Sequence, residues 1–84
     1  MMNKILIKLY VPTIEEQYDL WIPTGRKIYS VIVLLINAIS DLSQGEYKPN
    51  KMPKLYSRLT GIEFDMNLKV NETMMKNGTE VILM

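Results

Sequence analysis

The stretch from Tyr18 to Ser40, YDLWIPTGRKIYSVIVLLINAIS, changes from strand-like to helix-like periodicity within a few residues. Before Pro23, alternate side chains fall on opposite faces, which is typical of a half-buried strand. After Gly25, apolar residues recur every three or four positions, which predicts a helix over about residues 26–43. Its predicted buried arc contains Ile28, Val31, Ile32, Leu35, Ile39 and Leu42. One helix is therefore available to cover a sheet.

Strand-like segments lie on both sides of this helix. Residues 4–11 and 17–22 alternate in polarity and are joined by a predicted loop, so they form a predicted antiparallel hairpin. Its expected pairs are Leu6 with Trp21 and Lys8 with Asp19. After a predicted loop over 44–54, we expect strands at 55–60 and 80–84, a short extended piece at 63–66, and a turn at Asn77-Gly78.

The order strand, strand, helix, strand, strand predicts an α+β fold of the β-grasp type. In this fold one main helix packs on one face of a mixed sheet. The first and final strands are then parallel and central, and the expected order across the sheet is second, first, final, third. The length of 84 residues predicts a single domain over residues 1–84, with one modest core.

The composition argues against several classes of function. The chain has no histidine and no cysteine, so it cannot form Ser-His, Cys-His or His-metal sites. It also has no phosphate-binding glycine motif. We expect no catalytic residue, no cofactor and no metal. A net charge of +1 gives no reason to expect nucleic acid as a partner.

The apolar runs are too short for a membrane protein. The longest, Val31–Ile36, falls far short of the ~20 residues that a membrane helix needs. Residues 1–4 lead directly into a strand-like run without a signal peptide. The sequence therefore predicts a cytoplasmic protein that does not insert into a membrane.

Several apolar side chains fall where water is expected. On the helix these are Val33 and Leu34. On the sheet face away from the helix they are Leu6, Tyr10, Trp21, Tyr56, Ile82 and Met84. In the expected strand order, Trp21, Leu6, Ile82 and Tyr56 line up across that face. A contiguous apolar stripe favours a protein-binding surface, for which we select Leu6, Trp21, Tyr56, Ile82 and Met84. The alternative is that the loop over 44–54 covers this face.

The chain resembles two groups of proteins. Its second half resembles ubiquitin, because a strand ends at Gly61 and NLKVNETMMKNGTEVIL places the apolar anchors Val70 and Met75 before a turn and a final strand. Its first half, YDLWIPTGRKIYSVIVLLINAISDLS, resembles the YukD/EsaB proteins. These are small ubiquitin-fold proteins associated with type VII (WXG-type) secretion in Gram-positive bacteria. The matching residues are Tyr18-Asp19-Leu20, Pro23, Lys27-Ile28 and Leu42-Ser43.

The resemblance implies a cytosolic, non-catalytic adaptor that serves a type VII secretion machine as an accessory or regulatory component. Its partner would be a component of that machine or a second copy of the chain. Ubiquitin-type modifiers and sulfur carriers end in a free Gly-Gly tail, whereas this chain ends at Met84, so we do not expect conjugation. The alternative function is a small ubiquitin-fold auxiliary subunit of a multicomponent enzyme such as a diiron oxygenase.

Overall fold

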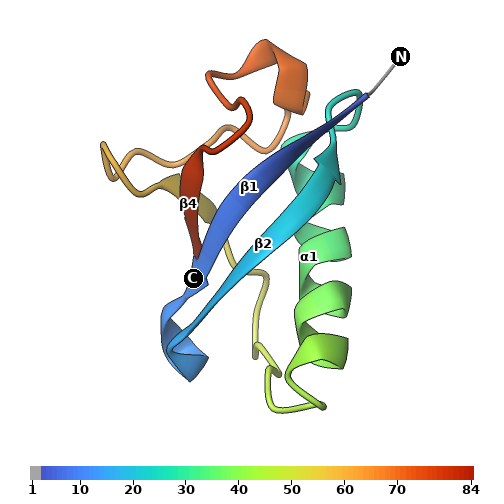
Figure 1. Ribbon diagram of the computed structural model, residues 1–84, viewed down its shortest axis with the longest axis vertical. Helices are drawn as coiled ribbons and strands as arrows, with labels where there is room; N and C mark the ends of the chain where they lie inside the picture. Colours follow the sequence, from blue (N-terminus) through green and yellow to red (C-terminus); the bar gives the residue numbers. More distant parts are fainter. Residues whose placement is uncertain (1–2) are drawn as a thin grey trace.

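A computed structural model describes residues 3–84 as a four-stranded mixed sheet with one long helix across one face (Figure 1). The sheet contains β1 (Lys4–Val11), β2 (Glu16–Pro23), β3 (Leu55–Ser57) and β4 (Glu80–Leu83), and the helix is α1 (Ile28–Leu42). The strand order is β2-β1-β4-β3, with β1 and β4 parallel and the other pairs antiparallel. The predicted β-grasp fold is confirmed. Residues 1–2 of the predicted domain lie outside the described residues.

The hairpin has the predicted register. Leu6 pairs with Trp21 and Lys8 with Asp19. The connection is a short 3₁₀ helix, Pro12–Ile14, followed by Glu15 in a left-handed conformation with φ 52°. Pro12 suits this position because it cannot donate a ladder hydrogen bond and its φ is already fixed. β2 begins one residue earlier than predicted and ends one residue later.

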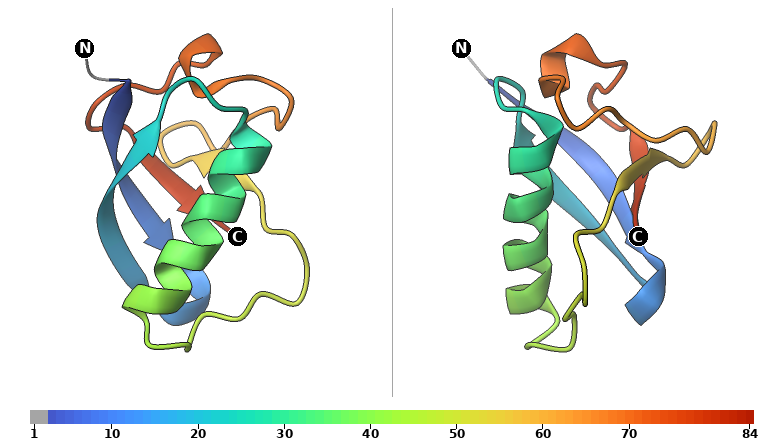
Figure 2. Two further views of the ribbon diagram at one scale, coloured as in Figure 1. Left: turned by 90° about the vertical axis from the view of Figure 1, so that its right-hand side faces the viewer. Right: turned by 180° about the vertical axis from the view of Figure 1, so that it is seen from behind.

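The helix and the sheet bury one core between them (Figure 2). Five residues of the predicted arc are buried: Ile28, Val31, Ile32, Leu35 and Ile39. The prediction for Leu42 is wrong, since this side chain is 54% exposed. The chain turns sharply at Gln44 and Gly45, which have φ values of 56° and 82°, and brings Tyr47 into the core instead. Tyr47 is 5% exposed, and its backbone N–H donates to Ser43 Oγ at 3.0 Å.

The second half contains less strand than predicted. The strand expected at 55–60 ends at Ser57, because Arg58–Thr60 turn and Gly61 N–H donates back to the Ser57 carbonyl at 2.8 Å. The extended piece expected at 63–66 is reduced to a single bridge between Glu63 and Tyr56. Val70 and Met75 are buried as predicted, and Gly78 has the positive φ, 86°, of a tight turn.

Candidate functional site

The outer face of the sheet, which lies away from α1, differs from the predicted apolar stripe. Leu6 does pair with Trp21, and Tyr56 does pair with Ile82. However, the parallel register places Ile82 opposite Tyr10, four residues along β1 from Leu6. The expected line of Trp21, Leu6, Ile82 and Tyr56 is therefore wrong. The apolar residues form two groups at opposite ends of the outer face.

Charged residues separate these two groups. Asp19, Lys8 and Glu80 lie in one row across β2, β1 and β4. Arg58 approaches Glu80 at 3.9 Å, lies 5.3 Å from the centre of the Tyr10 ring, and reaches Gln17 Oε1 at 3.4 Å. An arginine in this position shields the ring of Tyr10 from water. The sequence predicted the Lys8–Asp19 pair of this row but not the position of Arg58, because it assigned Arg58 to a strand that ends at Ser57.

The five selected interaction residues are exposed to different degrees. Trp21 is 54% exposed and Met84 57%, whereas Leu6, Tyr56 and Ile82 are half-buried. Trp21 and Leu6 lie at the end of the outer face near Pro23, and Tyr56, Ile82 and Met84 lie beside the β3–β4 pair. A partner could therefore contact either group without crossing the charged row.

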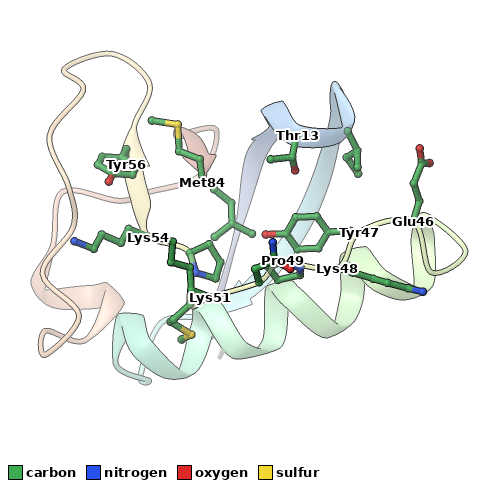
Figure 3. A pocket seen from close by; sticks show the side chains of 14 residues that line it. Thr13, Glu46, Tyr47, Lys48, Pro49, Lys51, Lys54, Tyr56 and Met84 are labelled. Atoms are coloured by element: carbon green, nitrogen blue, oxygen red, sulfur yellow. The ribbon is translucent and has the colours of Figure 1, made fainter.

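One groove, the loop groove, lies beside the group that contains Tyr56 and Met84 (Figure 3). Its volume is about 570 Å³, and Tyr56 and Met84 line one end while Glu46 and Lys48 line the other. The predicted loop over 44–54 thus borders part of the selected surface. Lys54 is held by two backbone hydrogen bonds to Met84 and by an ion pair with Glu63 at 3.8 Å. The remaining lining residues are Thr13, Ile14, Tyr47, Pro49, Asn50, Lys51, Met52, Pro53, Lys54 and Leu83.

A second groove, the β2–α1 groove, lies between the edge strand and the helix. Its volume is about 450 Å³. Most of its lining is apolar, and Leu34, one of the exposed helix residues noted in the sequence, is 41% exposed there. Trp21 also lines this groove, so it borders both the outer face and the helix side. The lining residues are Lys4, Leu20, Trp21, Ile22, Pro23, Arg26, Leu34, Leu35 and Ala38.

The electrostatic environment differs along β2. Tyr18, near its start, has its pKa raised by partial burial and by the carboxylates of Glu16 and Glu46. Lys4 and Arg26 line the β2–α1 groove toward the other end of the strand. The surroundings of β2 are thus acidic near its start and basic near its end.

The beginning of α1 offers no free cluster of backbone donors. The N–H groups of Ile28 and Tyr29 donate to the carbonyls of Leu68 and Met66 at 2.8 and 3.1 Å. An anion would have to displace these bonds to use the start of the helix. Arg26 and Lys27 are both exposed beside it.

Two carboxylates in the second half of the chain, Glu63 and Asp65, have structural partners. Glu63 pairs with Lys54, and Asp65 Oδ1 accepts the Asn67 N–H at 2.8 Å. Within residues 3–84, no three carboxylates come together in a way that could hold a metal ion. In the same range, no helix is both long and apolar enough to span a membrane.

Comparisons with known proteins agree on the fold. No family model and no curated protein matches the sequence. Among solved structures, a chain of the MycP5-free ESX-5 inner membrane complex aligns with 99% of this protein at a TM-score of 0.80 and 10% identity. This protein spans only 21% of that chain's length.

Two isolated domains align over nearly their whole length. The EccD5 ubiquitin-like domain from Mycobacterium xenopi gives a TM-score of 0.79 at 15% identity, with 99% of this chain and 94% of that one covered. The ubiquitin-like domain of the Mycobacterium tuberculosis type VII secretion protein ECCD1 gives 0.77 at 10% identity, with 98% of both chains covered.

A toluene 4-monooxygenase complex also contains a chain of this shape. Its TM-score is 0.74 at 4% identity, with 95% of both chains covered. All of these identities are low, so the likeness establishes a shared architecture. The protein has the ubiquitin-like β-grasp fold.

Proposed function

We propose that this protein is a non-catalytic, non-conjugated ubiquitin-like adaptor of a type VII secretion system, of the YukD/EsaB kind, acting in the cytoplasm of a Gram-positive bacterium. The observation that supports this most directly is the near-complete alignment with the ubiquitin-like domains of EccD5 and ECCD1. The sequence features shared with the YukD/EsaB proteins point to the same system.

The adaptor role is also supported by the chemistry of the chain. A protein without histidine or cysteine lacks the side chains most often used for nucleophilic and acid–base catalysis. Its exposed surface instead offers Trp21 and Met84, which belong to residue types enriched in protein interfaces. The binding surface would comprise Leu6 and Trp21 on one side and Tyr56, Ile82 and Met84 on the other.

Affinity capture from the producing bacterium tests this proposal. We expect tagged full-length protein to recover membrane-complex subunits of the secretion system, and deletion of its gene to change the export of WXG-type substrates. Trp21→Ala should weaken the capture, whereas Leu59→Ala should not, because Leu59 is a 94% exposed turn residue outside the paired strands and outside the selected surface. Normal export after deletion, together with no recovered secretion subunit, would contradict the proposal.

The second candidate is an auxiliary subunit of a multicomponent oxygenase. It is favoured by the full-length alignment with a chain of the toluene 4-monooxygenase complex. In that case the same affinity capture would recover a diiron hydroxylase, and adding the purified protein would increase the rate of the hydroxylase. Recovery of secretion subunits alone would argue against this candidate.

A further inference from the structure

The two edges of the sheet differ in whether another segment of the chain bonds to them. The β3 edge is covered by the following segment, since Ser57 N–H donates to the Ile62 carbonyl at 2.9 Å and Phe64 N–H to the Leu55 carbonyl at 2.8 Å. β2 lies at the other edge, where β1 is its only strand neighbour among residues 3–84 (Figure 2). A bare edge of eight residues is a template for pairing with another extended chain.

The register identifies the backbone groups that face this edge. Thr24 N–H donates to the Asn3 carbonyl at 2.8 Å, and hydrogen-bonded pairs alternate along an antiparallel ladder. Tyr18, Leu20 and Ile22 therefore bond to β1, and Gln17, Asp19 and Trp21 direct their N–H and C=O groups away from it. Leu6 and Lys8, opposite Trp21 and Asp19, use their own backbone groups on the β4 side, bonding Gly78 and Thr79 at 2.8 and 3.0 Å.

The β2–α1 groove runs beside these free groups. Leu20, Leu34, Leu35 and Ala38 give it an apolar lining, and its volume of about 450 Å³ has room for apolar side chains. Both charged residues that line it, Lys4 and Arg26, are cations, so the groove favours a segment with negative charge at that end.

We propose that β2 binds an extended segment of a partner protein as a fifth strand, with alternate apolar side chains in the β2–α1 groove and an acidic flank beside Lys4 and Arg26. Backbone hydrogen bonds to Gln17, Asp19 and Trp21 would give affinity, and the groove and cations would select the sequence. This inference deepens the proposed adaptor function, on which it rests for the nature of the partner, by assigning the chemistry that the adaptor recognises.

An extended segment fits this site better than a second copy of the chain does. In a second copy, the β2 side chains on the helix side are already packed: Ile22 is 1% exposed, and Tyr18 and Leu20 are packed against its own core. Those side chains could not also fill the groove of the first copy. An isolated extended segment has free side chains on that face and brings no helix of its own.

Fluorescence titration with synthetic peptides tests the proposal, because Trp21 is the only tryptophan and lies on the edge. Two capped probes of about ten residues, a typical upper strand length, would carry alternating Ile/Val and Thr residues. One would have an Asp-rich flank at its N-terminus and the other at its C-terminus. We expect one probe to bind more strongly, and which one it is reports the direction of the added strand. No binding of either at millimolar concentration would overturn the proposal.

Asp19→Pro and Asp19→Ala form the matched pair of variants. Both remove the carboxylate, but only proline removes the outward N–H, and this N–H makes no bond to β1. We expect Asp19→Pro to bind the preferred probe about tenfold more weakly than Asp19→Ala, with amide signals elsewhere unchanged. Equal affinities in two folded variants would overturn strand addition.

Charge reversal tests the flank. Arg26→Glu should weaken binding of the Asp-flanked probe about tenfold and strengthen binding of the same peptide with a Lys-rich flank. Lys51→Glu, a change in the loop groove, should leave both affinities unaltered.

Sedimentation tests whether a second copy of the chain occupies the edge instead. A dimer whose formation protects the amides of Gln17, Asp19 and Trp21 would overturn the proposal. Peptide binding is measured without any secretion component, so its failure is separate from failure of the affinity capture.

Discussion

Trp21 is the residue whose role can be decided most directly. It is 54% exposed at the sheet edge and lies between the outer face and the β2–α1 groove. We expect Trp21→Ala to leave the melting temperature nearly unchanged and to weaken partner binding about tenfold or more, because exposed aromatic anchors often dominate an interface. A core tryptophan would instead lose about 3–5 kcal/mol on truncation. A collapsed melting curve would therefore contradict its placement at the surface.

Tyr47 makes the stability of the protein depend on alkaline pH. Burial raises the pKa of its phenol above the ordinary value of 10.0, so the folded state keeps this proton to higher pH than the unfolded state. The contribution of the protonated Tyr47 phenol to the free energy of unfolding is constant below about pH 10. It is lost as the pH rises from there through the folded-state pKa. In urea unfolding at several pH values, Tyr47→Phe should show a shallower alkaline decline. Tyr29→Phe, at an exposed position, is the control and should keep the wild-type slope.

At the level of single elements, α1 depends on its buried face. Six β-branched residues from Ile28 to Ile39 lower its intrinsic helix propensity, so packing must hold the helix. Leu35 is 2% exposed and its neighbour Leu34 is 41% exposed. Leu35→Ala should lower the free energy of unfolding by about 2–5 kcal/mol, and Leu34→Ala by less than about 1 kcal/mol. If thermal or urea unfolding showed similar losses of unfolding free energy for Leu35→Ala and Leu34→Ala, the helix would pack through a different face.

The elements that the sequence predicted well are those with strong periodicity. The alternation in residues 4–11 and 17–22 determined the hairpin and its register, because a slip of one residue would turn Trp21 toward the core. The helix arc was predicted except at Leu42. The parallel register of β1 with β4 could not be predicted, since no short turn links these strands and their pairing depends on how the 43–79 segment folds.

That missing register explains what was wrong in the candidate site. The sequence correctly assigned Leu6, Trp21, Tyr56 and Ile82 to one face of the sheet. It did not predict their positions along that face. Arg58 was placed in a strand, and its reach over Tyr10 to Gln17 depends on a turn that starts at that residue. Both grooves involve residues far apart in sequence, such as Ile14 with Met84 or Trp21 with Ala38, so periodicity alone could not reveal them.

For the whole molecule, the sheet topology predicts an uneven pattern of amide hydrogen exchange. β1 is central and its backbone groups are used on both sides, toward β2 and toward β4 or the 77–79 turn, so its amides should exchange only when the whole domain unfolds. On β2 the amides of Tyr18, Leu20 and Ile22 should be slow, whereas those of Gln17, Asp19 and Trp21 should be fast although they belong to a regular strand.

Residue-resolved exchange measured by NMR at low protein concentration checks this pattern. The alternation reflects hydrogen bonding to one neighbour only, because both sets of amides lie in the same strand and differ chiefly in which side they face. A partner segment that adds to the edge should slow Gln17, Asp19 and Trp21 and leave β1 nearly unchanged. Uniformly slow β2 amides in the free protein would contradict an open edge, because outward N–H groups become protected only when another chain or segment bonds to them.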